Sequence, residues 1–174
     1  MNCLFETTHL RVRKFDPADV QRLYENHSEE LMQKWIPNEC YADTAEAEDA
    51  VRFYRNCVEN GSLPYVLAVE LKETGELIGD VGVNEVEGNP QEVEIGYSIC
   101  EKYSGCGYAS EVVGAMTEFV SEMFGIHVLY GRVLRGNSAS VRVLEKNGYR
   151  FAGEGTDAED DPYGNGMLIY KKLT

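Results

Sequence analysis

The residues best suited to chemistry form a short glycine-containing loop, Ser104-Gly105-Cys106-Gly107-Tyr108-Ala109-Ser110. The loop follows a predicted strand and opens the longest predicted helix. Its backbone N–H groups therefore have no acceptor within the helix, and the positive end of the helix dipole lies behind them. Glycine lets the backbone approach a pyrophosphate closely, and amides bind it without a lysine or arginine in the loop. The pattern predicts a phosphate-binding cradle.

Three other interpretations of this loop can be compared with its sequence. A tight turn between a strand and a helix gives the same glycine pattern without any ligand, and this alternative stays open. A P-loop requires a final Gly-Lys-Ser/Thr, which is absent. A dinucleotide-binding fold requires a complete GxGxxG after a first parallel strand, whereas this loop follows three strands that we expect to be antiparallel.

The elements that position the loop can be predicted from periodicity and from turn residues. Strands are expected at residues 9–15, 65–71, 77–86, 93–99, 127–133, 149–153 and 167–173. Helices are expected after Asp16 and Asp43, from the loop to Gly125, and at residues 137–146, with a short amphipathic stretch ending at Pro37. This order predicts a single α/β (α+β) domain over residues 1–174. Its central sheet is mixed and mostly antiparallel, with about seven strands and helices on both faces.

Composition narrows the possible partners. The net charge of −14 disfavours nucleic acid and anionic membranes and suits a cationic substrate, although an acidic surface that only maintains solubility is equally consistent. The five cysteines include no CxxC pair and have no histidine at metal-ligand spacing, so we expect reduced thiols and no metal. No run of about 18 apolar residues occurs, and we expect a cytoplasmic protein.

Three motifs, taken in order, carry a resemblance to a known family. They are Glu94-Ile95-Gly96-Tyr97, the loop from Ser104 to Glu111, and Asn137-Ser138-Ala139-Ser140 with Leu144-Glu145-Lys146-Asn147-Gly148-Tyr149. They resemble the motifs of the GCN5-related N-acetyltransferase (GNAT) superfamily, most closely the branch of ribosomal-protein N-terminal and spermidine acetyltransferases. The resemblance runs from about Leu10 to Leu173. It implies the GNAT fold and acetyl transfer from acetyl-CoA to a primary amine.

The resemblance also implies which residues contact the cofactor. The amides from Gly105 to Ser110 are expected to hold the CoA pyrophosphate, and the backbone around Ser98 and Ile99 to pair with the pantetheine arm. The cofactor contacts implied are Ser98, Ile99, Ser104, Gly105, Cys106, Gly107, Tyr108, Ala109, Ser110 and Asn137. Ser104 departs from the glutamine or arginine that usually begins the loop, which puts one side-chain contact in doubt but not the amide cradle.

Acetyl transfer requires a neutral amine, a polarised thioester carbonyl and a proton for the departing thiolate. Glu94 is the candidate base, because it alternates with apolar residues in its strand and the family has a carboxylate here; a solvated glutamate would look the same. Asn137 begins a helix, where its amide is expected to hold the pantetheine or the thioester; a plain N-cap would also fit. Leu144 replaces the tyrosine acid of many members. Ser140 is therefore the candidate acid, or the thiolate leaves unprotonated.

The acceptor is less closely defined. A protein or peptide N-terminal amine is our first expectation, and a small cationic amine such as a polyamine or aminoglycoside is the second. Protein α-amino groups, with a pKa of about 7.8, are partly neutral already, whereas lysine-like amines, with a pKa of about 10.4, need a base. Trp35 and Tyr41 are placed at the acceptor cleft by analogy, while Tyr97 and the histidines are predicted to be structural. A non-catalytic acyl-CoA sensor and an unrelated α+β structural domain are the other interpretations. Exposed strand edges would permit a homodimer.

Overall fold

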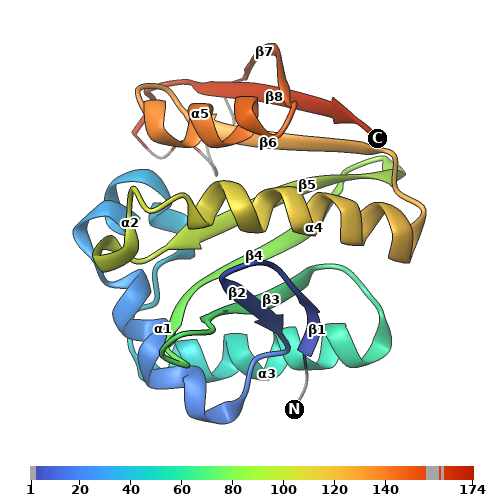
Figure 1. The fold of residues 1–174 in the computed structure, drawn as a ribbon. Helices are drawn as coiled ribbons and strands as arrows, with labels where there is room; N and C mark the ends of the chain where they lie inside the picture. Colours follow the sequence, from blue (N-terminus) through green and yellow to red (C-terminus); the bar gives the residue numbers. More distant parts are fainter. Residues whose placement is uncertain (1–2, 156–160, 162) are drawn as a thin grey trace.

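One mixed sheet of eight strands organises the protein (Figure 1). A computed structural model describes residues 3–155, 161 and 163–174. The strands lie in the order β1-β2-β3-β4-β5-β6-β8-β7, and every neighbouring pair is antiparallel except β5 and β6. Their bounds are β1 (Cys3–Glu6), β2 (Leu10–Arg13), β3 (Tyr65–Leu71), β4 (Leu77–Val86), β5 (Asn89–Ile99), β6 (Val128–Leu134), β7 (Arg150–Gly155) and β8 (Met167–Leu173).

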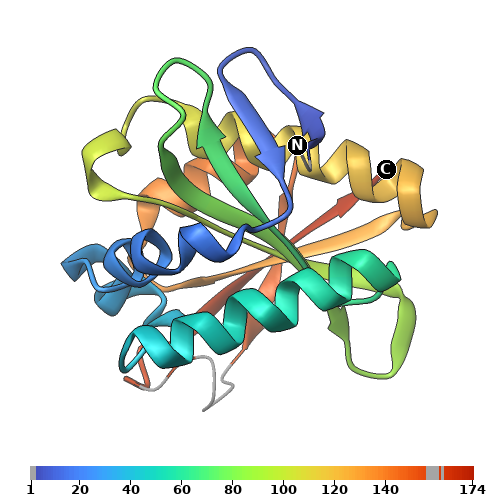
Figure 2. The same ribbon diagram turned by 90° about the horizontal axis from the view of Figure 1, so that it is seen from below.

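Helices cover both faces of the sheet, as predicted (Figure 2). They are α1 (Val20–His27), α2 (Glu30–Trp35), α3 (Thr44–Asn60), α4 (Tyr108–Phe124) and α5 (Ser138–Lys146), with 3-10 turns η1 (Pro17–Asp19), η2 (Pro37–Glu39) and η3 (Glu101–Tyr103). A core on one face includes Met116 of α4 and Leu144 of α5. A smaller cluster on the other face joins Leu23 of α1 and Val51 of α3 to the sheet.

The predicted helix boundaries follow from capping residues. Asp16 caps the 3-10 turn that leads into α1. Asp43 caps α3, since its Oδ1 accepts a hydrogen bond from the amide of Glu46 (2.9 Å). Gly61 and Gly125 end α3 and α4 in the left-handed conformation, with φ of 64° and 63°.

The largest differences between the sheet and the prediction are an additional strand and the start of β5. The eighth strand is β1, which pairs with β2 and is too short, at four residues, to give a recognisable alternation. The start of β5 was predicted at Val93, but the strand begins at Asn89, which pairs with Val86 across a tight turn at Gly88. Asn89 and Pro90, which were predicted to belong to the turn, are therefore part of β5.

The separation of β5 from β6 creates room for a site. The two strands pair only through residues 92–94 and 128–130. Beyond Glu94, β5 stays bonded to β4 as far as Ile99, and β6 stays bonded to β8 as far as Leu134. Among the described residues, no strand therefore pairs with the outer edge of residues 95–99.

Candidate active site

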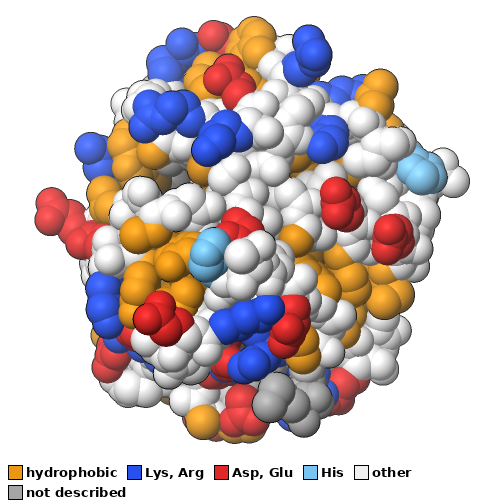
Figure 3. All heavy atoms as spheres, in the orientation of Figure 1, with side chains coloured by type: hydrophobic (Ala, Val, Ile, Leu, Met, Phe, Trp, Pro, Cys, Tyr) orange, Lys and Arg blue, Asp and Glu red, His pale blue; other side chains and the backbone are white. Residues whose placement is uncertain are grey.

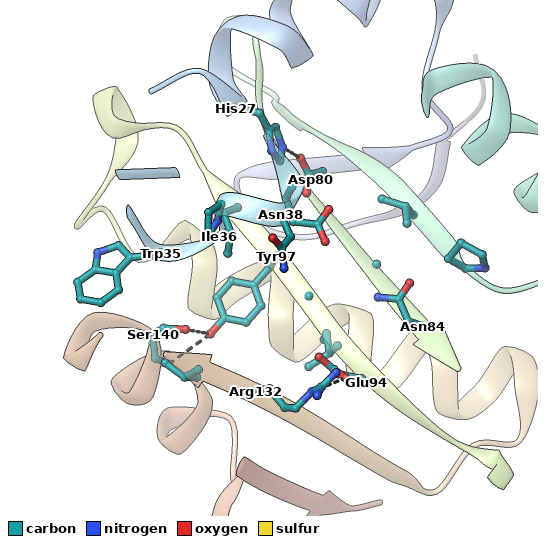
Figure 4. Close-up of a pocket in the computed structure, with 18 of the residues that line it drawn as sticks. His27, Trp35, Ile36, Asn38, Asp80, Asn84, Glu94, Tyr97, Arg132 and Ser140 are labelled. Atoms are coloured by element: carbon teal, nitrogen blue, oxygen red, sulfur yellow. Dashed lines mark hydrogen bonds and ion pairs between the residues drawn. The ribbon is translucent and has the colours of Figure 1, made fainter. Parts of the chain in front are cut away.

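A cavity of about 340 Å³ lies where β5 diverges from β6 (Figure 4). Strands β4, β5 and β6 form its floor, and α2, α3 and the start of α5 contribute to its walls. Its polar and ionisable lining residues are His27, Asn38, Glu39, Asp80, Asn84, Glu94, Arg132, Asn137 and Ser140. The aromatic ones are Trp35, Phe53, Tyr41, Tyr54 and Tyr97. Trp35 and Tyr41, placed here by analogy, do line this cavity.

The floor contains two glycines flanked by two carboxylates. Gly82 of β4 and Gly96 of β5 are register partners. Asp80 precedes Gly82 by two residues and Glu94 precedes Gly96 by two residues, so in antiparallel strands they lie on opposite sides of the glycine pair, each about 7 Å along the strand. A Cβ atom on Gly96 would meet nothing within 4 Å. The floor is therefore open at Gly96, whereas a Cβ atom on Gly82 would lie 2.8 Å from Cγ2 of Val66.

Glu94 points away from the core, as its alternation with apolar residues predicts. Val93 and Ile95 are buried, whereas Glu94 lines the cavity. Arg132 of β6 donates a hydrogen bond from Nε to Oε2 of Glu94 at 2.8 Å. The sequence alone does not identify this ion pair, because the parallel pairing of β5 with β6 brings Arg132 to Glu94.

Asn137, Ser140 and Tyr97 meet on the opposite wall. Asn137 is the N-cap of α5, since its Oδ1 accepts from the amide of Ser140 (3.3 Å), and it also lines the cavity. The Ser140 hydroxyl lies 2.7 Å from the phenol oxygen of Tyr97. Burial raises the pKa of Tyr97 to about 12, so the phenol is protonated at neutral pH. Tyr97 was predicted to be a structural residue. Its ring does pack against the core, but its hydroxyl reaches the cavity.

A second polar cluster occupies the other end of the cavity. His27 is only 2% exposed, and its Nε2 lies 2.6 Å from Oδ2 of Asp80. Ser98 donates to the same oxygen from Oγ at 3.0 Å. Burial opposes the charged form of His27, but Asp80 and the backbone of Glu39 outweigh it, so the pKa of His27 is raised. His27 was predicted to be only structural, and it also contributes to the cavity wall.

The loop predicted to bind phosphate lies at the N-terminus of α4. Gly105 and Gly107 have φ of 75° and 86°, a conformation that favours glycine, and a Cβ on either would meet nothing within 4 Å. The amide of Glu111 makes the first helical hydrogen bond, to the carbonyl of Gly107 (3.0 Å). The amides of residues 108–110 therefore have no acceptor within the helix. The loop has an accessible surface, room and donors for an anion.

Neighbouring elements fix the start of α4. Asn147 donates from Nδ2 to the carbonyl oxygen of Ser110 (3.1 Å) and to its hydroxyl (3.2 Å). The carboxylate of Glu111 accepts from the amide of His9 (2.8 Å) and from the hydroxyl of Thr7. Although burial opposes ionisation, these bonds lower the pKa of Glu111. Asn147, from the last of the three sequence motifs, thus helps to hold the loop that forms the second motif.

Positive charge gathers beside this loop. Figure 3 shows lysine and arginine side chains at the top of the view, over α5 and the strands β7 and β8. These three elements carry the cations Arg142, Lys146, Arg150, Lys171 and Lys172 and the anions Glu145 and Glu154. In a chain with a net charge of −14, this region is locally basic and favours an anionic ligand.

Leu144 occupies a different environment from the cavity residues. It is fully buried, and a Cβ on Gly131 of β6 would lie only 2.8 Å from its Cδ1 and Cδ2. The phenol beside Ser140 comes instead from Tyr97 of β5. Within residues 3–155, 161 and 163–174, no cluster of His, Cys, Asp and Glu could hold a metal ion. No helix in these ranges is long and apolar enough to cross a bilayer.

Comparisons with known proteins agree with this architecture. Residues 9–150 match the family model described as an acetyltransferase (GNAT) domain. The chain is 26% identical over 149 residues to the uncharacterized N-acetyltransferase p20 of Bacillus licheniformis, covering 86% of this chain and 82% of the relative. A GNAT-family acetyltransferase from Bacillus anthracis has a TM-score of 0.81 at 25% identity, with 99% and 98% of the two chains covered.

Two further structures share the fold at lower identity. The ribosomal-protein-S5-alanine acetyltransferase from Vibrio fischeri has a TM-score of 0.82 at 18% identity, with 97% and 95% covered. The microcin C7 self-immunity acetyltransferase MccE, in complex with acetyl-CoA and AMP, has a TM-score of 0.81 at 13% identity, with 97% and 94% covered. From the matching family model and these relatives, the chain belongs to the GNAT family and is an N-acetyltransferase.

Proposed function

We propose that this enzyme transfers the acetyl group of acetyl-CoA to the N-terminal amine of a protein or peptide. The observation that carries the proposal is the free edge of β5 at residues 95–99, which runs between the loop at the start of α4 and the cavity. An extended ligand arm can pair with such an edge as an additional strand. One molecule with a phosphate group at one end and a reactive group at the other would then occupy both places.

The donor side of the proposal consists mainly of backbone. The amides of Gly105 to Ser110, including those of Cys106, Tyr108 and Ala109, would hold the pyrophosphate, with Ser104 at the entrance of the loop. The backbone of Ser98 and Ile99 would pair with the pantetheine arm. The basic region over α5, β7 and β8 favours the approach of this anionic co-substrate.

The reactive end would lie between Glu94 and the start of α5. Asn137 would hold the pantetheine or the thioester through its side-chain amide. Glu94 would accept a proton from the attacking amine, directly or through a water, and Ser140 would give a proton to the departing sulfur. The hydrogen bond between Ser140 and the protonated phenol of Tyr97 supports this last role, because the phenol can return the proton.

A small cationic amine is the second candidate acceptor. The carboxylates of Glu39, Asp80 and Glu94 all line the cavity, and aromatic side chains supply several of its walls. This combination suits a cation. The fold shared with a ribosomal-protein acetyltransferase supports the peptide acceptor instead.

Release of CoA from acetyl-CoA tests the proposal. The acceptors would be peptides with a free N-terminus, the same peptides with a formylated N-terminus as the matched control, and spermidine, and mass spectrometry would locate the added acetyl group. We expect acetylation at the α-amine and none of the formylated peptide. Acetyl-CoA binding without release of CoA for any amine would contradict the proposal and support an acyl-CoA sensor.

A further inference from the structure

The proposed reaction requires more proton transfers than Glu94 and Ser140 provide. An amine acceptor reaches the enzyme mostly as an ammonium ion with three N–H bonds, and the amide product keeps one. Two protons must therefore leave the nitrogen, and one must reach the sulfur. Glu94 accounts for one removal and Ser140 for the one addition. An acceptor that binds as the ammonium ion therefore needs a second proton acceptor on the enzyme, an inference that rests on the proposed function.

Asp80 is placed to supply it. It lies across the open glycine floor from Glu94, and its side chain is 16% exposed. His27 and Ser98 both contact the same carboxylate oxygen, Oδ2, at 2.6 and 3.0 Å. Figure 4 shows His27 and Asp80 at one end of the cavity and Glu94 with Arg132 at the other. An amine above Gly96 would thus have a carboxylate on each side.

We infer that Asp80, supported by His27, binds the ammonium form of the acceptor and takes its first proton. An N–H bond of the ammonium breaks, and the proton is shared between the Asp80 carboxylate and His27. The freed lone pair attacks the thioester carbonyl, so that the N–C bond forms and the C–S bond breaks. Glu94 takes the second proton from nitrogen, and Ser140 gives one to sulfur. Of the two protons removed, one restores Ser140 and the other leaves to solvent.

The ionisable groups that face His27 come from several elements. The ring of Tyr41 lies 5.4 Å from the imidazole, and Tyr54 of α3 and Glu39 of η2 act on the same cluster. Burial raises the pKa of Tyr41 strongly and that of Tyr54 to about 12, so both phenols stay protonated. The raised pKa of His27 supports its capacity to share a proton with Asp80.

A purely structural role explains this pair less well. Leu23 of α1 and Leu77 of β4 already belong to one apolar cluster, which joins the two elements. Asn26 of α1 also donates to the carbonyl oxygen of Leu77 (3.4 Å). Burying an ion pair costs desolvation energy that apolar packing avoids. The His27–Asp80 pair lines the cavity, as a role in catalysis requires.

Isosteric variants separate the two carboxylates. Asp80→Asn and Glu94→Gln would each be measured with butylamine, whose amine pKa is near the lysine value of about 10.4, and with a peptide α-amine near about 7.8. We expect Asp80→Asn to lower kcat/KM for butylamine roughly hundredfold at pH 7 and kcat/KM for the peptide much less. The lost kcat/KM for butylamine should recover roughly tenfold per pH unit toward pH 9. Glu94→Gln would lower kcat/KM for both acceptors to the same extent. Full activity of Asp80→Asn, or an equal loss for both acceptors at every pH, would overturn the inference.

A second measurement is independent of turnover. The titration of the His27 imidazole would be followed by NMR in the wild type and in Asp80→Asn, with and without butylamine. Bound ammonium competes for the charge of Asp80, so we expect butylamine to lower the pKa of His27 in the wild type only. No effect in the wild type would overturn the inference. An effect without any CoA release would instead leave the ammonium site standing and contradict the proposed function.

Discussion

The two ends of the proposed reaction path are built from different parts of the chain. The loop at the start of α4 is local, exposed and made mainly of backbone amides held open by Gly105 and Gly107. The cavity is assembled from strands and helices distant in sequence, and paired side chains, Glu94 with Arg132 and Asp80 with His27, define it. The difference implies that the loop tolerates side-chain changes which spare its backbone geometry, whereas the cavity depends on individual functional groups.

The largest effect is expected at Gly107. Gly107→Glu adds a side chain at positive φ and a negative charge at the cradle, so acetyl-CoA affinity should fall by more than roughly hundredfold, or about 2.8 kcal/mol. Gly125→Glu is the matched control, because Gly125 has a similar positive φ and equal open space at the other end of α4. Calorimetric titration with acetyl-CoA measures both. Equal weakening by the two variants would show that strain in α4, and not the cradle, is responsible.

Removal of the Ser140 hydroxyl should have the next largest effect. Ser140→Ala is expected to reduce kcat roughly hundredfold with little change in acetyl-CoA affinity, since the sulfur loses its proton donor. Tyr97→Phe removes only the partner of that hydroxyl and should reduce kcat less. Rapid-quench measurement of the acetyl-transfer step checks both variants. Near-full turnover of Ser140→Ala would remove this residue from the proposal.

A substitution in the floor tests the cavity by shape alone. Gly96→Leu should fill the space between Asp80 and Glu94 and lower kcat/KM for the acceptor roughly tenfold, or about 1.4 kcal/mol. Gly96→Ala is the graded control, because a Cβ alone meets no neighbouring atom. Steady-state kinetics at saturating acetyl-CoA would show the effect. An unchanged acceptor kcat/KM in Gly96→Leu would place the amine elsewhere.

The smallest effect concerns the support of the loop. Glu111→Gln should destabilise the fold by roughly 1–2 kcal/mol at pH 7, because the charged carboxylate accepts bonds from the hairpin of β1 and β2. The pKa of Glu111 is lowered from its ordinary 4.5, so the wild-type advantage is present above that pH and is lost as the pH falls through the folded value. Urea unfolding at pH 7 and 3.5, with the exposed Glu118→Gln as control, measures it. A pH-independent difference would contradict this account.

The same contrast explains what the sequence could predict. The loop, the three strands before it and the caps at Asp16 and Asp43 depend on neighbouring residues, so their patterns are visible in the sequence. Glu94 was identifiable from the alternation of its strand. The pairing of His27 with Asp80, 53 residues apart, depends on the packing of α1 against β4.

The proton donor shows the same limit. Tyr97 shares a face of β5 with the apolar residues Val93 and Ile95, which is typical of a core residue, and only the position of α5 brings Ser140 to its hydroxyl. The one signal available for Asp80 was its alternation with Val81 and Val83, which are buried on the other face of β4. Without the register of β4 and β5, that signal does not connect Asp80 to Glu94.

A crystal structure of the enzyme with bound CoA would locate both ends of the proposed reaction path. We expect the pyrophosphate on the amides of residues 105–110, the pantetheine arm along the free edge of β5, and the sulfur within hydrogen-bonding reach of Ser140. A pyrophosphate bound away from the start of α4, or a sulfur outside the cavity between Glu94 and Ser140, would contradict it.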